Sequence, residues 1–263
     1  MRLGISTAHF EFEGWDDALA RAQEMGFDFI EVFAATMTNE EASAIAALGE
    51  KSGMAATYHA PFAGKWDLGV TDPRFGGLLL RSAVEQARMM AARYLIVHPG
   101  RFDALRPDGR RQALEQVIAI VESCVPALEA GGIALCLENN TSAHHPNELA
   151  DRPADFERLF AALPACVGMN LDFGHAHITG NTDAYLRQFV PRLRYAHLAD
   201  NHGERDEHLA PGQGTINWSH IAAACAAAGF RGPFCAEFPA ADLEAAQPHL
   251  QPLLGDRTRH RDP

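Results

Sequence analysis

Short apolar runs alternate with longer amphipathic stretches along the whole chain. Runs of roughly four to eight apolar residues are typical of buried strands, whereas apolar positions three and four residues apart are typical of helices. The apolar runs predict strands at Leu3–Ala8, Phe29–Phe33, Ala55–His59, Tyr94–His98, Ala134–Glu138, Val167–Asp172, Leu193–Leu198 and Pro233–Phe238. The amphipathic stretches predict helices at Trp15–Met25, Asn39–Lys51, Pro73–Ala92, Arg110–Ala130, Pro153–Leu163, Thr182–Val190, Trp218–Ala228 and Ala240–Leu254.

This alternation of strand and helix predicts a parallel sheet, and eight repeats predict that the sheet closes on itself. We therefore expect one α/β domain, a single (β/α)8 TIM barrel over residues 1–254, followed by a polar tail at residues 255–263. Gly53 and Gly229 follow predicted helices, where the left-handed C-terminal position favours glycine. Pro126 falls inside a predicted helix and is expected to kink it.

The charge composition of the chain argues against nucleic acid as a partner. The chain of 263 residues has a formal net charge of −12, with 22 Lys and Arg against 34 Asp and Glu. Because phosphate backbones are bound mainly by Lys and Arg, a long nucleic-acid footprint is disfavoured. The five cysteines include no Cys-x-x-Cys pair, which is typical of a reduced, cytoplasmic protein. We expect no signal peptide and no membrane-spanning segment.

The ends of the predicted strands carry residues of the metal-binding types. Active sites of such barrels lie at the C-terminal ends of the strands. The third to eighth predicted strands end in, or are followed closely by, His59, His98, Glu138, Asp172 with His175, His197 with Asp206 and His208, and Glu237. Neutral imidazole and carboxylate are the usual ligands of zinc-like and manganese-like ions.

A single histidine at a strand end is more often a hydrogen-bonded polar residue than a ligand. Glu138 and Glu237, however, each follow an apolar strand into a barrel mouth, where an unpaired carboxylate is costly. Six successive strands with such ends therefore predict a centre for divalent metal ions, with zinc or manganese preferred over magnesium or cobalt. Substrate-binding roles also fit His175, Asp206 and His208.

A second set of residues lies where a substrate would be contacted. These residues follow the predicted strands or occupy their ends, although ordinary surface packing or a plain polar strand end is the alternative for several of them. They are His9, Glu31, Phe62, Trp66, Arg101 and Asn139. The stretch Gly212-Gln213-Gly214-Thr215 looks like a phosphate-binding loop but lacks its lysine, so we interpret it as a tight turn before the helix at Trp218.

Together these residues resemble the xylose-isomerase-like TIM barrels, which comprise sugar phosphate isomerases and epimerases and the endonuclease IV type of apurinic-site nuclease. The resemblance extends from the first predicted strand to the eighth. Its most specific motifs are His59-Ala60-Pro61-Phe62, Val97-His98-Pro99-Gly100, Leu137-Glu138-Asn139, Asp172-Phe173-Gly174-His175, His197-Leu198-Ala199-Asp200, Asp206-Glu207-His208 and Gly212-Gln213-Gly214-Thr215-Ile216-Asn217-Trp218.

The resemblance implies two ligand arrangements. Isomerases and epimerases of the group hold one Mn, Mg or Co ion with a Glu, Asp, His, Glu set, and the two glutamates also move protons. That set matches Glu138, Asp172, His197 and Glu237. The nuclease type holds three zinc ions with nine ligands, which here match His59 and His98 with a bridging Glu138 for the first ion, Asp172, His197 and Glu237 for the second, and His175, Asp206 and His208 for the third.

Two functions follow from these arrangements, with one to three ions per chain. The loop after the second strand is short and uncharged and the loop after the first is acidic, so duplex DNA is an unlikely substrate. We favour a metal-dependent isomerase or epimerase of a small sugar or sugar phosphate, with an enediolate stabilised by the metal and Glu138 and Glu237 as acid and base. The alternative is a multinuclear phosphoester hydrolase acting on a small molecule. A homo-oligomer is compatible with the sequence.

Overall fold

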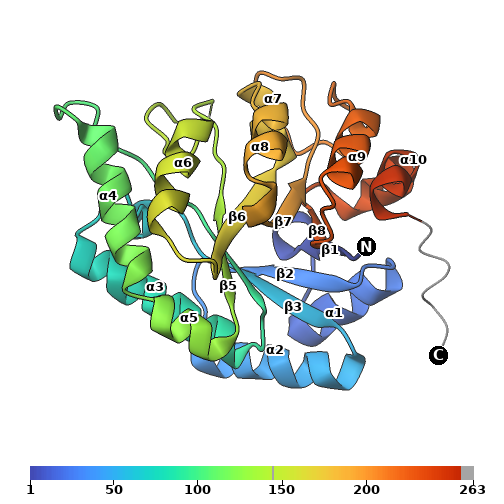
Figure 1. Ribbon diagram of the computed structural model, residues 1–263. Helices are drawn as coiled ribbons and strands as arrows, with labels where there is room; N and C mark the ends of the chain where they lie inside the picture. Colours follow the sequence, from blue (N-terminus) through green and yellow to red (C-terminus); the bar gives the residue numbers. More distant parts are fainter. Residues whose placement is uncertain (144, 256–263) are drawn as a thin grey trace.

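A closed barrel of parallel strands forms the centre of the computed structural model (Figure 1). The structure describes residues 1–143 and 145–255, so the predicted tail lies outside the described residues except for Gly255. The order of the strands around the barrel follows the chain, and β8 pairs back onto β1. The strands are β1 Leu3–Ser6, β2 Phe29–Phe33, β3 Ala55–His59, β4 Tyr94–Val97, β5 Ala134–Glu138, β6 Val167–Asp172, β7 Leu193–Leu198 and β8 Phe234–Ala236. The prediction of a single (β/α)8 TIM barrel is confirmed.

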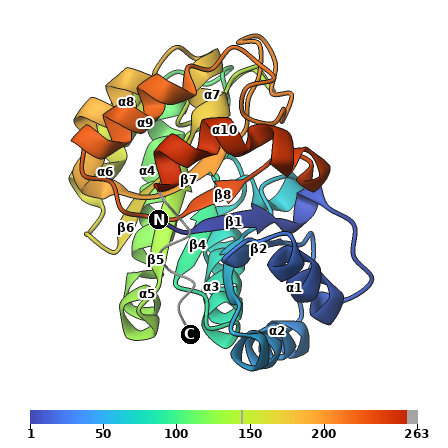
Figure 2. The same cartoon turned by 90° about the vertical axis from the view of Figure 1, so that its right-hand side faces the viewer.

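Helices surround the barrel on the outside (Figures 1 and 2). The α-helices are α1 Trp15–Glu24, α2 Asn39–Ser52, α3 Pro73–Met89, α4 Gly109–Glu122, α5 Val125–Gly131, α6 Pro153–Ala162, α7 Phe173–Ile178, α8 Thr182–Gln188, α9 Trp218–Ala227 and α10 Leu243–Leu254. Short 3-10 turns occur at η1 Thr7–His9, η2 Gly64–Trp66, η3 Val190–Arg192 and η4 Ala240–Asp242. Local chemistry sets several boundaries: Thr38 and Glu41 form a capping box at the start of α2, and Gly53 ends that helix with φ 76°. Within the described residues, no helix has the length and apolar character needed to cross a membrane.

The structure departs from the predicted elements in two helical regions and at the ends of several elements. The predicted helix 110–130 is two helices, and the break precedes Pro126 because proline occupies the first turn of α5, where no N–H is needed. The helix α7 was not predicted; it starts after Asp172, whose side chain accepts a hydrogen bond of 2.6 Å from the His175 N–H. The strands β1, β4 and β8 are one to three residues shorter than predicted at their ends.

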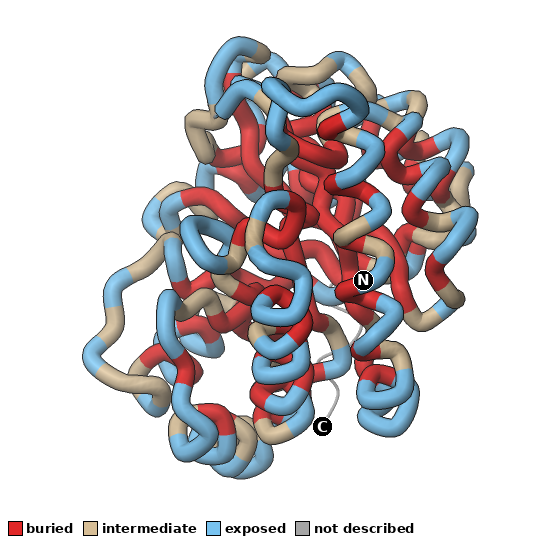
Figure 3. The backbone as a smooth tube through the Cα atoms, turned by 90° about the vertical axis from the view of Figure 1, so that its left-hand side faces the viewer, coloured by how far each residue is buried: buried red, intermediate tan, exposed pale blue. Residues whose placement is uncertain are grey.

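The two faces of each strand carry different residues, because successive side chains point to opposite sides. Side chains that face outward, such as Ile30 and Val32, pack in the large core between barrel and helices. Buried segments accordingly form the inside of the molecule and exposed ones its periphery (Figure 3). The barrel interior has its own small cluster of Phe29, Ile96, Cys136, Tyr195 and Cys235.

The inward-facing positions explain where the polar residues fall. Two residues beyond Ile96, Cys136, Tyr195 and Cys235, on the same face of each strand, the chain carries His98, Glu138, His197 and Glu237. The parallel register brings neighbouring strand ends level, as in the pairs Phe33 with His59 and Asp172 with His197. The predicted ligands at the strand ends therefore form one layer above the apolar interior of the barrel.

Candidate metal centre

A cavity of about 440 Å³ opens above this layer. Its walls combine side chains from the ends of the strands with side chains from the loops that follow them. The lining residues are Ser6, Ala8, His9, Phe33, His59, Phe62, Ala63, Asp67, His98, Gly100, Arg101, Glu138, Asn140, Glu148, His175, Asp206, His208 and Glu237. Asp172 and His197 are buried and are not among the lining residues.

The first group of donor atoms joins β3, β4 and β5. Glu138 Oε2 lies 3.4 Å from His59 Nε2 and 3.4 Å from His98 Nε2, and all three residues are buried. His59 Nδ1 donates to the Ala60 carbonyl at 2.8 Å, so the lone pair of Nε2 faces the carboxylate side. These three residues could hold one ion.

The second group shares Glu138 and adds residues from β6, β7 and the end of β8. His197 Nδ1 lies 3.1 Å from Glu237 Oε2, 3.4 Å from Glu138 Oε2 and 3.9 Å from Asp172 Oδ2. Two ligand atoms that each lie about 2.1 Å from one tetrahedral ion are about 3.4 Å apart, so the observed spacing suits a single ion. Four buried donors of the hard and borderline types favoured by divalent metals meet at this point.

The third group lies on the cavity wall. Asp206 Oδ2 is 3.5 Å from His175 Nε2 and 2.8 Å from His208 Nε2. His208 Nδ1 donates to the Glu237 carbonyl at 2.7 Å, which fixes the ring. The structure therefore brings together all nine predicted ligands, and Glu138 connects the first group to the second.

The electrostatics of the cluster suit a cation. Burial opposes the charge of Glu138, yet His98 and His197 hold its pKa well below the usual range. Burial also opposes ionisation of Glu237, but His197 lowers its pKa to about 2. Conversely, Glu237, Glu31 and Glu138 outweigh burial and raise the pKa of His197 well above its usual value. In the metal-free protein a proton on His197 thus balances carboxylates, and a divalent ion can take over that role.

Asp172 differs from the two glutamates. Burial is the main cause that raises its pKa to about 7, and the nearby Glu138 and Glu237 add to the effect. Asn139 holds the backbone of Asp172 in place, since its Oδ1 accepts from the Asp172 N–H at 2.7 Å and its Nδ2 donates to the Asp172 carbonyl at 2.9 Å. Neutralising this crowded set of carboxylates again calls for a cation.

The residues predicted to contact a substrate divide into two sets. His9, Phe62 and Arg101 line the cavity. Glu31, Trp66 and Asn139 are not among the described residues that line it, and a substrate contact for these three stays a prediction. Glu31 lies inside the barrel, Trp66 packs against the core from η2, and Asn139 bridges β5 and β6.

Some residues that line the cavity were not predicted from the sequence. Phe33 could have been found, because it lies two residues beyond Glu31 on the inward face of β2. Asp67 and Glu148 gave no local signal, since long loops bring them to the cavity. Asp67 pairs with Arg101 at 2.5 Å, and Glu148 accepts from Asn140 Nδ2 at 2.9 Å.

The loop between β7 and α9, which carries Asp206 and His208, folds around one carboxylate. Asp200, which is buried, accepts hydrogen bonds from the backbone N–H groups of Asn201, Gly212 and Ile216 and from the Trp218 indole, at 2.8–3.1 Å. A Cβ at Gly214 would lie 2.3 Å from Asp200 Oδ1, so this position requires glycine. The turn predicted for Gly212-Gln213-Gly214-Thr215 thus encloses a carboxylate of the chain itself.

Asp200→Asn is expected to loosen this loop, because the new amide places two N–H groups against donors that need an acceptor. Leaving buried donors unpaired costs about 1–3 kcal/mol each, so the free energy of unfolding should fall by about that amount or more. Hydrogen exchange at the amides of Gly212 and Ile216, together with urea unfolding, measures both effects. Asp183→Asn, on the surface beside His220, is the control. Unchanged protection of both amides would contradict the role given to Asp200.

Comparison with known proteins agrees with this architecture. The family model of the xylose isomerase-like TIM barrel matches residues 19–253, so the chain belongs to that family. A crystal structure of a D-tagatose 3-epimerase-like protein superposes with a TM-score of 0.84 and 22% identity, covering 96% of this chain and 98% of that one. Two further structures match over 96% of this chain and 98% of their own. They are the Escherichia coli 3-keto-D-glucoside 4-epimerase YcjR, with a TM-score of 0.77 and 17% identity, and the zinc-bound IOLI protein, with a TM-score of 0.79 and 16% identity.

Proposed function

We propose that the protein is a divalent-metal-dependent epimerase or isomerase of a sugar or sugar phosphate. The observation that carries the proposal is the group of Glu138, Asp172, His197 and Glu237, in which the two glutamates line the cavity from β5 and from the residue after β8. Structural neighbours named as sugar epimerases, and a zinc-bound neighbour, support the same class of reaction.

The four residues of the second group would hold the ion, which when bound polarises a carbonyl or hydroxyl oxygen of the substrate. Glu138 and Glu237 reach the cavity from different strands, and in the metal-free protein the pKa of each is lowered, at Glu138 by His98 and His197 and at Glu237 by His197. In our proposal one of the two, as a carboxylate, takes the proton from the carbon beside the carbonyl, and the other, as a carboxylic acid, gives its proton to the opposite face of the same carbon, so the two groups exchange protonation states in each turnover. The Nε2 of His175 would bind a substrate hydroxyl, because its Nδ1 is occupied by the Asn139 carbonyl.

The cavity itself suits a small polar molecule with an apolar edge. Phe33 and Phe62 stack at 5.8 Å, and Phe62 also stacks on His98 at 4.5 Å, which gives the cavity an aromatic surface. Sugars present C–H groups on one side and hydroxyls on the other. Arg101, the arginine of the cavity lining, is held by Asp67 and is the candidate contact for a distal hydroxyl or a phosphate.

One observation favours a second candidate, a multinuclear phosphoester hydrolase acting on a small substrate. The group of His59, His98 and Glu138 offers a further metal position that a one-metal epimerase does not need. Two ions that share Glu138 could stabilise the attacking and leaving oxygens of a phosphoester.

Two measurements test the proposal. Ketoses and their phosphates are incubated with the protein in D₂O, and NMR follows deuterium entering the carbon beside the carbonyl. An epimerase incorporates solvent deuterium and forms the epimer. Release of phosphate from esters, with no exchange into any sugar, would overturn the proposal in favour of the hydrolase.

His59→Ala separates the two candidates by metal content. With one ion in the second group, the variant should keep about one ion per chain, because His59 is not among its four donors. With ions in both groups, the variant should lose about one equivalent relative to the wild-type protein. Elemental analysis of protein purified without chelator or nickel gives the count, and His220→Ala, an exposed histidine paired with Asp183, is the matched control.

A further inference from the structure

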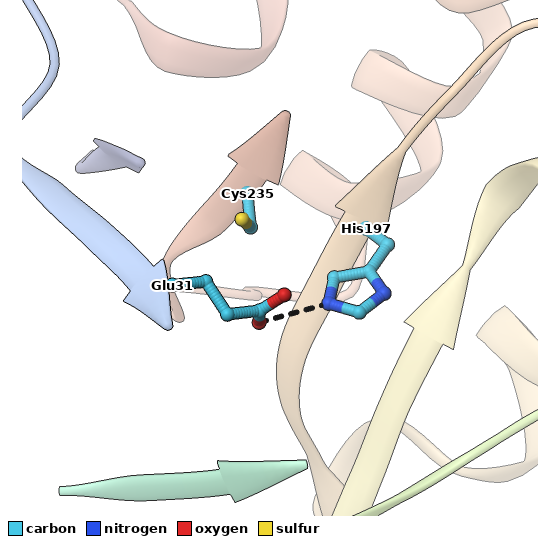
Figure 4. Close-up of side chains that lie close together, drawn as sticks. All are labelled: Glu31, His197 and Cys235. Carbon is cyan, nitrogen blue, oxygen red and sulfur yellow. Dashed lines mark hydrogen bonds and ion pairs between the residues drawn. The ribbon is translucent and has the colours of Figure 1, made fainter. Parts of the chain in front are cut away.

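A buried carboxylate lies directly behind the candidate metal centre. Glu31, on the inward face of β2, is fully buried, and His197 Nε2 donates a hydrogen bond of 3.0 Å to its Oε2 (Figure 4). The other oxygen, Oε1, has no hydrogen-bond partner among the described residues. Burying a carboxylate with one oxygen unpaired is costly, so a role in folding alone does not account for Glu31.

The position of Glu31 has a consequence for the imidazole of His197. An imidazole that gives its Nε2 proton to a carboxylate keeps its Nδ1 lone pair available. On the opposite side of the ring, Nδ1 faces Glu138, Asp172 and Glu237. In the metal-free protein with Nδ1 unprotonated, its lone pair accepts a hydrogen bond of 3.0 Å from Asn170 Nδ2, which a bound ion would replace. The ring is also held by the His59 ring stacked at 5.8 Å and the Tyr195 ring edge-on at 5.6 Å.

We propose that Glu31 is a positioning residue of the metal centre, which keeps the proton of His197 on Nε2 and turns Nδ1 toward the bound ion. The proposal rests on the metal dependence proposed above. Carboxylate partners of ligating histidines fix the tautomer and raise the basicity of the ligand. Glu31 does this from a strand that contributes no ligand to the second group, so the centre is supported by β2 as well as by β5 to β8.

Cys235 is the third residue near this pair. Its Sγ lies within 4.8 Å of donor atoms of Glu31 and His197, so the three could in principle hold an ion of their own. A direct hydrogen bond of 3.0 Å between Glu31 and His197 already occupies the Nε2 side of the ring. We therefore assign this side of His197 to Glu31 and only the Nδ1 side to the metal.

Glu31→Gln tests the proposal without changing the size of the side chain. Zinc affinity is measured on the whole protein by competition with a chromophoric chelator, with zinc alone as the ligand. We expect the dissociation constant to rise about 10–100-fold, the usual cost of removing such a partner. Asp155→Asn is the matched control: it also neutralises a buried carboxylate, paired with Arg110, and should lower stability without changing zinc affinity.

A second measurement keeps the test independent of how well the variant folds. In the zinc-loaded wild-type protein, ¹⁵N NMR of the His197 ring should show a protonated Nε2 and a metal-bound Nδ1. Coordination through Nε2, loss of a zinc equivalent in Cys235→Ala, or equal zinc affinity in Glu31→Gln and wild type would overturn the proposal. Failure of the wild-type protein to bind zinc would overturn it together with the metal dependence. Zinc binding that depends on Glu31, without exchange into any sugar, would support Glu31 and reject the epimerase.

Discussion

Glu138→Gln is expected to abolish turnover, with a fall in kcat of at least about a thousandfold. Glu138 Oε2 lies 3.4 Å from His59 Nε2, His98 Nε2 and His197 Nδ1, so one carboxylate serves two donor groups. Glutamine keeps the volume but loses the charge, and its amide N–H groups cannot bind a metal. The variant therefore loses both the proposed proton transfer and the donor that the first two groups share.

Two readouts separate these losses. The rate of deuterium exchange into the sugar reports proton transfer, and elemental analysis reports the bound metal. Asp155→Asn serves again as the control for loss of a buried negative charge away from the cavity, and should retain both. Exchange at more than a tenth of the wild-type rate in Glu138→Gln, with full metal content, would remove Glu138 from the mechanism.

Metal affinity is expected to depend steeply on pH. The neighbouring carboxylates raise the pKa of His197 well above its usual value, so the metal-free protein carries a proton there that the ion must displace. Protonation competes with the metal, so affinity rises with pH and falls as pH is lowered. One displaced proton gives about a tenfold loss of affinity per pH unit, hence at least about a hundredfold between pH 8 and pH 6. Asp172, with its pKa raised to about 7, should steepen the loss below pH 7.

Competition titrations at several pH values, corrected for protonation of the chelator, measure this dependence. Calorimetry in two buffers with different heats of ionisation counts the protons released per ion. Glu207→Gln changes a carboxylate paired with the half-exposed His202 and should leave the slope as it is. An affinity that stays constant between pH 6 and pH 8 would show that no titrating ligand is displaced.

Much of the fold follows from local patterns in the sequence. The eight strands are short apolar runs, and glycine or capping residues mark the helix ends, as at Gly53 and Thr38. The six-residue helix α7 could not be predicted from the sequence, because it is too short to show a helical period and its start depends on a single cap from Asp172. The helix that was expected to kink at Pro126 is instead divided just before it, because proline is tolerated in the first turn of a new helix.

The candidate site was predictable in part for a related reason. Residues at the ends of parallel strands meet at one edge, so His59, Glu138 and Glu237 could be expected together before any coordinates. The depth of each side chain could not be expected, because it depends on the stagger of the strands. Glu31, for example, lies two residues before Phe33 on the same face of β2. Its side chain therefore hydrogen-bonds to His197 and does not line the cavity. Residues that long loops bring in, such as Glu148, leave no trace in local sequence.

The loop between β7 and α9, which encloses the Asp200 carboxylate, has a consequence for how this barrel can change. The carboxylate that organises the loop lies near its start, and the donors that surround it come from the loop itself and from the first residue of α9. The segment from Ala199 to Trp218 therefore contains both the carboxylate and the donors that fix its conformation. Such a segment can be exchanged as a unit between barrels of this family. The exchange would change the residues near Asp206 and His208, while the strands keep their ligands.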